Sequence, residues 1–209
     1  MSSAFRPLTP PFPPAAIESL KSLTLRLSEL EAFASEISTY HARHAQLATH
    51  PAVRGFLEQL EFLHASHARS LRHHVVALSA ESAPPMENSP RGVSELPAAA
   101  LASLEPDEIL TATYIRLNQL AALYTRLHTL AVAFARHATA EISLEHLKAI
   151  TPKIMECSQA LPQLTADDAY RRFGHITPGC AELALDATQA AWKNDTHFPD
   201  DTSSSSLQE

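Results

Sequence analysis

Two stretches of the chain carry apolar residues at alternating steps of three and four, the spacing of a helical seam. This spacing keeps one stripe of a helix turned toward a neighbour, so it constrains the fold more than any other feature of the sequence. In both stretches the stripe changes from aliphatic residues to histidine partway along. The first stripe is Leu20, Leu23, Leu27, Leu30, Ala34, Ile37, His41, His44 and Ala48, and the second is Val53, Leu57, Leu60, His64, His67, Leu71, His74 and Leu78.

The composition and the placement of the prolines favour an all-α fold. The 209 residues include only 4 glycines, and aromatic residues make up 6 %, whereas a sheet protein needs turn glycines and strand aromatics. No proline lies between Ala52 and Ala83 or between Asp107 and Thr151, so both spans can hold long helices. We predict an all-α antiparallel bundle of three or four long helices, with a short helical C-terminal extension and disordered termini.

Changes in composition divide the chain into one helical domain with a leader, a connection and a tail. Residues 1–14 contain five prolines and are predicted to be a disordered leader. Residues 82–97 are rich in proline and serine and are predicted to be a flexible connection within a single domain over 15–192. Residues 193–209 are acidic and serine-rich, a composition for which disorder is the default.

Proline and capping residues predict where the helices begin and end. A first helix over 14–48 is followed by a second over 51–80 that starts at Pro51, because proline suits a first helical position. So short a break implies an antiparallel hairpin. The connection also has room for a short helix over 98–104. A third long helix is predicted to begin near Glu105-Pro106, and its stripe is Leu110, Leu117, Leu120, Tyr124, Leu127, Ala131, Phe134 and Ala138.

The C-terminal third carries weaker signals. The sequence leaves open whether the third helix runs to Ile150 or turns near residues 139–143. Thr151-Pro152 resembles a cap and a first-position proline, so another helix is expected from there through Leu161. Asp167 and Asp168 are expected at a helix start. A turn over 174–179 should precede a short helix over 181–192, which could cover the end of the bundle with Leu183, Leu185, Ala190 and Trp192.

Charge and cysteine content limit the classes of partner. A formal net charge of −7 argues against broad electrostatic attraction to nucleic acid. No run approaches the ~18 apolar residues of a membrane span, so no membrane partner is expected. The chain has two cysteines, Cys157 and Cys180, and no basic leader followed by an apolar run. These features favour a reducing intracellular setting, cytoplasmic or nuclear.

The histidines can be interpreted as a metal site. His41 and His44 lie three positions apart on one helical face, and so do His64 and His67. Neutral imidazoles that project into a bundle core are reasonable ligands for zinc, iron or copper. Glu61-Phe62-Leu63-His64 matches the Glu-x-x-His pattern of di-iron bundles, and with the order of the helices it gives a resemblance to ferritin-like bundles. The candidate ligands are therefore His41, Glu61 and His64, with Zn or Fe as the cofactor.

Two features argue against such a site. Measured from the hairpin turn, the Cα atoms of His41 and His64 should be offset by roughly 9 Å along the axis, at ~1.5 Å rise per residue. The two His-x-x-His pairs are therefore not expected to close on one ion. A ferritin-like centre also needs carboxylates from the other helices, yet no Asp or Glu lies between Ile109 and Ala140, and residues 141–144 lack the histidine of a second Glu-x-x-His.

The remaining interpretation of the histidines is structural. A buried imidazole can bond to an acceptor through one ring nitrogen, or it can face a partner helix and set the register of pairing. No Gly-rich phosphate loop, Gly-x-Ser-x-Gly or Cys-x-x-Cys motif points to catalysis. Because long amphipathic helices need several neighbours, we expect a non-enzymatic intracellular helical scaffold or adaptor subunit that binds another helical protein or itself. The alternative is a histidine-rich metal-binding four-helix bundle.

Overall fold

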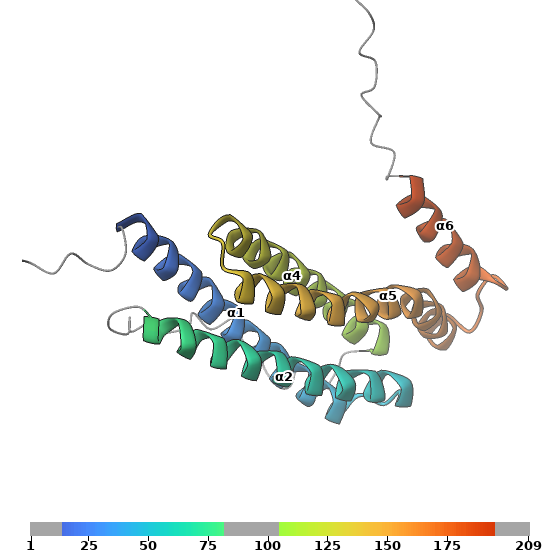
Figure 1. The fold of residues 1–209 in the computed structure, drawn as a ribbon. Helices are drawn as coiled ribbons and strands as arrows, with labels where there is room; N and C mark the ends of the chain where they lie inside the picture. The colour runs from blue at the N-terminus through green and yellow to red at the C-terminus, as the bar shows by residue number, and fades with distance from the viewer. Residues whose placement is uncertain (1–13, 82–104, 195–209) are drawn as a thin grey trace, which may run out of the picture.

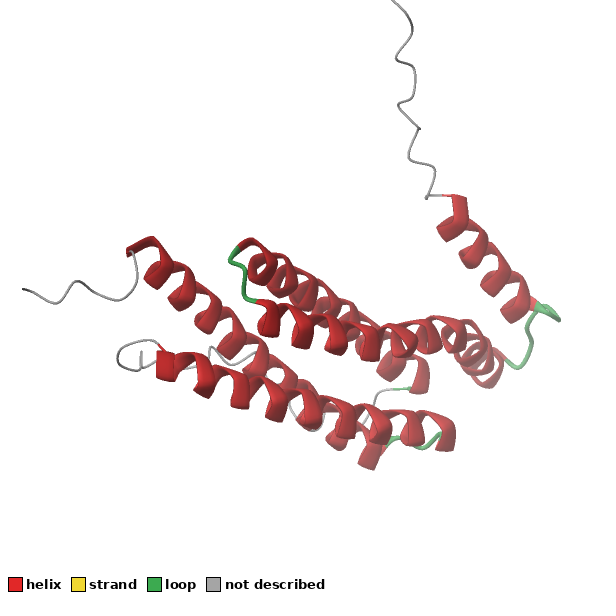
Figure 2. Cartoon of the chain, in the orientation of Figure 1, coloured by secondary structure: helices red, strands yellow, loops and turns green. Residues whose placement is uncertain are grey.

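The computed structural model describes residues 14–81 and 105–194, and every regular element in those ranges is an α-helix (Figures 1 and 2). The predicted all-α class is confirmed. The predicted leader up to residue 13, the connection over 82–97, the short helix over 98–104 and residues 195–209 of the tail lie outside the described residues. The helices are α1 (Pro14–Leu47), α2 (Pro51–Glu81), α4 (Pro106–Ala133), α5 (His137–Phe173) and α6 (Cys180–Asn194).

Helices α1 and α2 form the predicted antiparallel hairpin, and the heptad spacing correctly predicts which of their residues are buried. Every residue of the α1 stripe is at most 6 % exposed. On α2 the stripe is equally buried except at His74, which is half-buried. The second helix begins at Pro51, as predicted, and the Arg54 guanidinium closes the turn by donating to the backbone oxygen of Ala48 at 2.8 Å.

Helix α4 begins where the sequence predicts. Pro106 occupies the first turn, where its missing amide hydrogen costs nothing. A capping box joins Glu105 and Glu108, and the Glu105 amide donates to the Glu108 carboxylate at 2.9 Å. The acidic first turn also complements the positive end of the helix dipole.

The third helix does not continue to Ile150. It ends at Ala133, and the chain turns over residues 134–136, a few residues before the alternative turn that the sequence offers at 139–143. Ala135 adopts a left-handed backbone conformation there, with a φ of 54°. Because the helix ends early, Phe134 and Ala138 leave the predicted stripe and are exposed.

Helix α5 is one helix of 37 residues, so the predicted start at Thr151 and the predicted end at Leu161 are both wrong. It passes through Pro152 and Pro162, each of which removes a backbone hydrogen bond. The helix tolerates this loss because a buried seven-residue repeat continues across both prolines and packs against the bundle. The repeat consists of Ser143, Ile150, Cys157 and Leu164.

The last turns of α5 contain Asp167 and Asp168, which were expected at a helix start. Asp168 is buried and accepts hydrogen bonds from Arg171 at 3.2 Å and from Arg172 at 2.6 Å. Arg171 also pairs with Glu105 at 3.2 Å. The pair between Arg171 and Glu105 links the end of α5 to the start of α4.

The hairpins α1–α2 and α4–α5 pack against each other as a four-helix bundle. The first parts of α2 and α4 share one apolar cluster, which includes Leu57 and Leu117, and their later parts share another, which includes Leu71 and Leu127. Helices α2 and α4 therefore run in the same direction (Figure 1).

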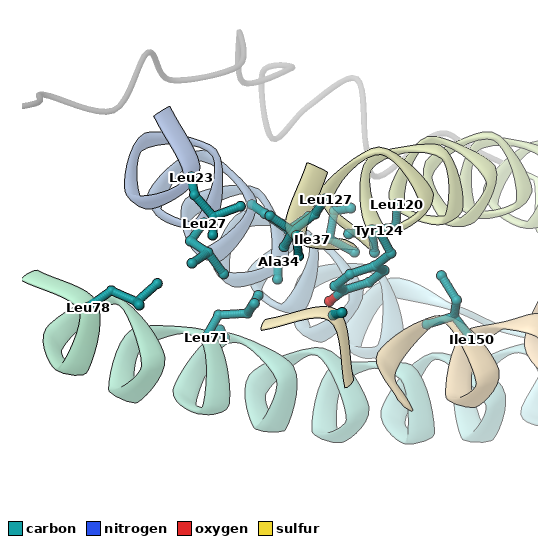
Figure 3. Close-up of a cluster of buried hydrophobic side chains, with 14 of the residues drawn as sticks. Leu23, Leu27, Ala34, Ile37, Leu71, Leu78, Leu120, Tyr124, Leu127 and Ile150 are labelled. Carbon is teal, nitrogen blue, oxygen red and sulfur yellow. The ribbon is translucent and has the colours of Figure 1, made fainter. Parts of the chain in front are cut away.

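Aliphatic side chains from all four bundle helices form the larger of the two clusters (Figure 3). Leu23, Leu27 and Leu71 are fully buried there, and Tyr124 belongs to the same cluster and is also fully buried. On α1 and α2 this cluster is separated from the smaller one by the histidines. Ile37 and Ala45 lie in different clusters on either side of His41 and His44.

Helix α6 points away from the bundle and does not cover its end (Figure 1). It packs on α5, but Leu183 is 65 % exposed and Ala190 is also exposed. The predicted covering role is therefore wrong. The turn over 174–179 redirects the chain through two glycines with positive φ, Gly174 at 76° and Gly179 at 72°, so α6 leaves the bundle axis.

Candidate functional site

Five buried histidines gather in the middle of the bundle, and we call them the histidine layer. They come from α1, α2 and α5, and none is more than 8 % exposed. The heptad stripes of α1 and α2 place four of them, because each occupies a position that would otherwise hold a core leucine. The members are His41, His44, His64, His67 and His146.

The rings of the layer contact one another across three helices. His41 of α1 stacks on His64 of α2, with ring centroids 5.2 Å apart. His64 meets His67 edge to face at 5.9 Å, and His67 stacks on His146 of α5 at 3.9 Å with only 9° between the ring planes. Tyr124 of α4 contacts both His67 and His146 edge to face. A continuous set of aromatic rings therefore crosses the core.

The predicted axial offset of roughly 9 Å, at ~1.5 Å rise per residue, does not keep His41 and His64 apart. In a helix the side chains lean toward the N-terminus. Because α1 and α2 are antiparallel, His41 leans away from the hairpin turn and His64 leans toward it, so the rings converge. These ring contacts do not bring the two His-x-x-His pairs onto one ion: within the described residues no three potential ligands surround one position.

Glu61, the third predicted ligand, does not join the rings. It is half-buried on the flank of the α2 stripe, and its backbone oxygen accepts from the Ser38 hydroxyl at 3.1 Å. Within residues 14–81 and 105–194, no three His, Cys, Asp or Glu side chains are already arranged around one metal position. The structure thus brings together His41 and His64 and leaves Glu61 outside the ring contacts.

Hydrogen bonds fix some of these imidazoles and leave others without partners. His44 donates through Nδ1 to the backbone oxygen of Tyr40 at 2.8 Å, and His67 Nδ1 shares a hydrogen bond with the Tyr124 hydroxyl at 3.1 Å. By contrast, both ring nitrogens of His41 and both of His64 are buried without a hydrogen-bond partner. Nε2 of His44 and Nδ1 of His146 are also buried without a hydrogen-bond partner. Unpartnered buried polar atoms are rare in proteins, so this group of six needs an explanation.

Burial keeps the imidazoles neutral. It lowers the pKa of His64 to about 4 and the pKa of His146 to about 4. Burial followed by the neighbouring His146 and His64 lowers the pKa of His67 to about 3. The pKa of His41 lies well below its usual value, first through burial and then through the nearby His64 and Arg116. At neutral pH each ring therefore offers one donor and one lone pair.

Arg116 places a positive charge beside the layer. Its guanidinium lies 3.8 Å from the centroid of the Tyr40 ring, which in turn contacts the His44 ring at 3.8 Å. No buried carboxylate balances this charge locally. Among the described residues the one buried acid is Asp168, which follows His146 on α5 by roughly 33 Å at ~1.5 Å rise per residue.

Sequence reasoning did not identify His146, Tyr40 or Arg116 as part of the site. The signal for His146 exists in the sequence, because it follows Ser143 by three positions and precedes Ile150 by four. All three positions precede Pro152, in a segment for which the sequence leaves the end of the third helix open. Tyr40 and Arg116 lie beside the stripes of α1 and α4, where spacing alone does not distinguish a surface residue from a neighbour of the core.

A second feature lies at the other end of α5. The elbow, which we define as residues 170–183, comprises the end of α5, the turn over 174–179 and the start of α6. Four large apolar side chains are exposed on it: Tyr170 by 57 %, Phe173 by 70 %, Ile176 by 37 % and Leu183 by 65 %. Exposed apolar side chains that gather on one segment are a feature of interaction sites on soluble proteins.

Comparison with known proteins assigns no function. No protein-family model matches the sequence, and none of the curated proteins matches it either. None of the described helices is both long and apolar enough to cross a membrane.

Proposed function

We propose that this protein is a non-enzymatic intracellular helical interaction subunit and that its partner surface is the elbow. The long heptad seams themselves are not the partner surface, because α1, α2, α4 and α5 bury their stripes against one another within the chain. A partner has to use another surface. The proposal keeps the adaptor role expected from the sequence and moves the contact to α5 and α6.

The observation that carries the proposal is the concentration of exposed apolar side chains on the elbow. Tyr170 and Phe173 lie one turn apart, and Ile176 follows within the adjoining turn. Helix α2 differs. On α2 the exposed Phe62 and Val76 are separated by 14 positions, or roughly 21 Å along the helix at ~1.5 Å per residue. Scattered exposed apolar residues are ordinary, whereas a group on one short segment favours docking.

A second copy of the chain is the partner that we propose. The arginines within the elbow are already paired, Arg171 with Glu105 and Asp168, and Arg172 with Asp168. Apart from the exposed Glu182, the elbow therefore offers mainly apolar area. An apolar patch of this kind is self-complementary in a two-fold dimer, in which the same patch from each copy meets.

Light scattering after size exclusion, over a range of concentrations of the full chain, tests the proposal. We expect a dimer that dissociates on dilution. Replacing Phe173 by serine should weaken dimerisation by about tenfold or more, because a central aromatic anchor typically contributes over 1 kcal/mol. Replacing Phe62 by serine is the matched control, since it removes an equally exposed phenylalanine from α2 and should leave the dimer unchanged.

Circular dichroism of both variants establishes that the helices are intact. A wild-type chain that stays monomeric at every concentration contradicts the proposal. Equal weakening by Phe173→Ser and Phe62→Ser contradicts it as well, because the effect would then come from general surface hydrophobicity and not from the elbow.

A further inference from the structure

Three polar contacts join α2 to α5, and we call them rungs. On each helix, neighbouring rungs lie seven or eight residues apart, which is about two helical turns. The rungs therefore follow one face of each helix and mark an antiparallel seam. They are the hydrogen bond from Lys153 Nζ to Gln59 at 2.9 Å, the ring stack of His67 on His146 at 3.9 Å, and the hydrogen bond between His74 Nε2 and the Thr139 hydroxyl at 2.7 Å.

Only the middle rung is buried on both helices. The hydrogen bond of Lys153 is exposed and His74 is half-buried, whereas His67 and His146 are at most 8 % exposed. The backbones of α2 and α5 also approach each other closely at fewer positions than those of α1 and α4. The seam between α2 and α5 is therefore the less closely packed side of the bundle, and two titratable side chains lie at its centre.

We propose that the seam between α2 and α5 opens in mild acid, with the more closely packed seam between α1 and α4 as the hinge. The opening separates the stacked rings of His67 and His146 and brings both into contact with water. Neither histidine belongs to the elbow, so this device does not depend on the proposed interaction role.

The groups that face the pair carry no negative charge at neutral pH. On α2, His64 meets His67 edge to face, and on α4 the Tyr124 ring contacts both members of the pair. On α1, His41 stacks on His64. A proton on either ring of the closed seam would thus be buried among neutral groups, and a buried charge without a counter-charge is costly.

The charged side chains around the layer do not supply that counter-charge. Arg69 of α2 and Glu145 of α5 are exposed to solvent. Glu61 lies on the flank of α2, where its backbone oxygen bonds to Ser38 of α1. Arg116 of α4 is a cation and opposes a second positive charge nearby. No carboxylate therefore stabilises protonated imidazoles while the seam is closed.

The direction of the pH effect follows from the two states of the pair. In the closed seam burial lowers the pKa of His146 to about 4, and burial followed by the neighbouring His146 and His64 lowers the pKa of His67 to about 3. In the open seam both rings regain the ordinary pKa of 6.5. At pH 7.5 they are neutral in both states. At pH 5.5 only the open state is protonated, which favours opening by about tenfold for each histidine and about 100-fold for the pair.

The native Cys157 reports the opening. It is fully buried on α5, in the apolar cluster that also holds Leu57 and Leu60 of α2. Mass spectrometry of peptides from the full chain measures how fast N-ethylmaleimide modifies Cys157 at pH 7.5 and at pH 5.5. The rate for glutathione at each pH corrects for the changing thiolate fraction. We expect the corrected rate to rise about 100-fold on acidification.

Variants without the pair should lose this rise. His146→Leu should lower the acid effect by about tenfold, and His67→Leu combined with His146→Leu should lower it to about tenfold or less. The matched control combines His73→Leu with His137→Leu, which removes one exposed histidine from each of the same two helices and should keep the full effect. The readout is a ratio of two rates for one variant, so a change in baseline stability cancels.

Urea distinguishes the opening of one seam from unfolding of the whole bundle, because denaturant acts in proportion to the surface exposed. At pH 5.5 low urea should change the corrected rate little, and circular dichroism should show intact helices. A rate that rises with urea as steeply as global unfolding would refute the hinge. An unchanged rate in acid for the wild type, or an equal acid effect in the chain without the pair, would also overturn the proposal.

Discussion

The stripe of α1 contains two regions that are equally buried and chemically opposite. Leu27 and His41 are both 0 % exposed and occupy equivalent positions of one heptad seam. Burial of the leucine removes apolar surface from water and stabilises the fold by about 1.5–3 kcal/mol. Burial of the imidazole removes two polar nitrogens from water and gives them no partner. The spacing of a seam therefore determines which residues are buried, and the residue type determines whether burial stabilises or destabilises.

The same contrast recurs on α2, where Leu71 and His64 are both fully buried. In each helix the histidines separate the two apolar clusters, so the core consists of aliphatic packing on both sides of a polar layer. A layer that costs free energy in the unliganded protein is the region in which pH, substitution and ligands should have their clearest effects. The aliphatic regions of the same seam serve as the comparison for the histidine layer.

Lowering the pH should produce the largest difference in stability between the histidine layer and the aliphatic regions. For His64, His67 and His146 the pKa in the folded state is about 4, 3 and 4, below the ordinary value of 6.5. Above about pH 7 these groups are neutral in the folded and unfolded states and leave stability unchanged. As the pH falls below 6.5, the unfolded chain takes up protons first, and each histidine lowers the free energy of unfolding by about 1.4 kcal/mol per pH unit.

Three such groups should remove several kcal/mol between pH 7 and pH 5, a large part of the about 5–15 kcal/mol that holds a domain together. Circular dichroism during chemical denaturation at each pH measures the effect in metal-free protein. In the control variant the exposed His73, His137 and His175 are replaced by glutamine. This variant should remain as sensitive to acid as the wild type. A triple His→Leu variant at 64, 67 and 146 should lose most of it. Equal acid sensitivity in both variants would disprove the role of the layer.

Shortening a buried leucine should have the next largest effect on the free energy of unfolding. Leu27→Ala removes most of a fully buried side chain from the larger cluster and leaves a cavity. We expect a loss of about 2–5 kcal/mol, measured by urea denaturation at pH 8. The loss should be nearly the same at pH 8 and pH 6, because no titrating group lies in that part of the seam. A strongly pH-dependent loss would show that the aliphatic region and the histidine layer do not respond separately.

The sequence predicts the first hairpin well and the second only in part. On α1 and α2 the three–four spacing, the short break and Pro51 all indicate the same structure, so local and long-range signals agree. On α5 the local and long-range signals conflict. Pro152 and Pro162 indicate helix boundaries, whereas the seven-residue repeat from Ser143 to Leu164 indicates one continuous helix. Packing against three neighbours outweighs the local cost of the prolines, and that packing is not visible in a local pattern.

For the histidine layer, the sequence identifies His41 and His64 as core residues and predicts the axial offset of their Cα atoms, but it does not predict that their rings meet. Height along a helix follows from residue number, whereas the approach of two side chains depends on the direction in which each leans. His146 is missed for a different reason, because it lies in the segment where the sequence leaves the end of the third helix open. The absence of Glu61 from the ring contacts reflects its position on the flank of α2.

Replacing one imidazole of the layer by leucine should give the smallest effect, with the opposite sign to an ordinary core substitution. His64→Leu keeps an apolar side chain of similar size in the stripe and removes two unpartnered buried nitrogens. In metal-free protein at pH 8 we expect a gain of about 1–2 kcal/mol in the free energy of unfolding. His73→Leu is the control, because it makes the same change at an exposed position of α2 and should alter stability by less than about 0.5 kcal/mol. A loss of stability in His64→Leu comparable to that in Leu27→Ala would show that the imidazole stabilises the core as a leucine does. The contrast between the two regions of the seam would then be wrong.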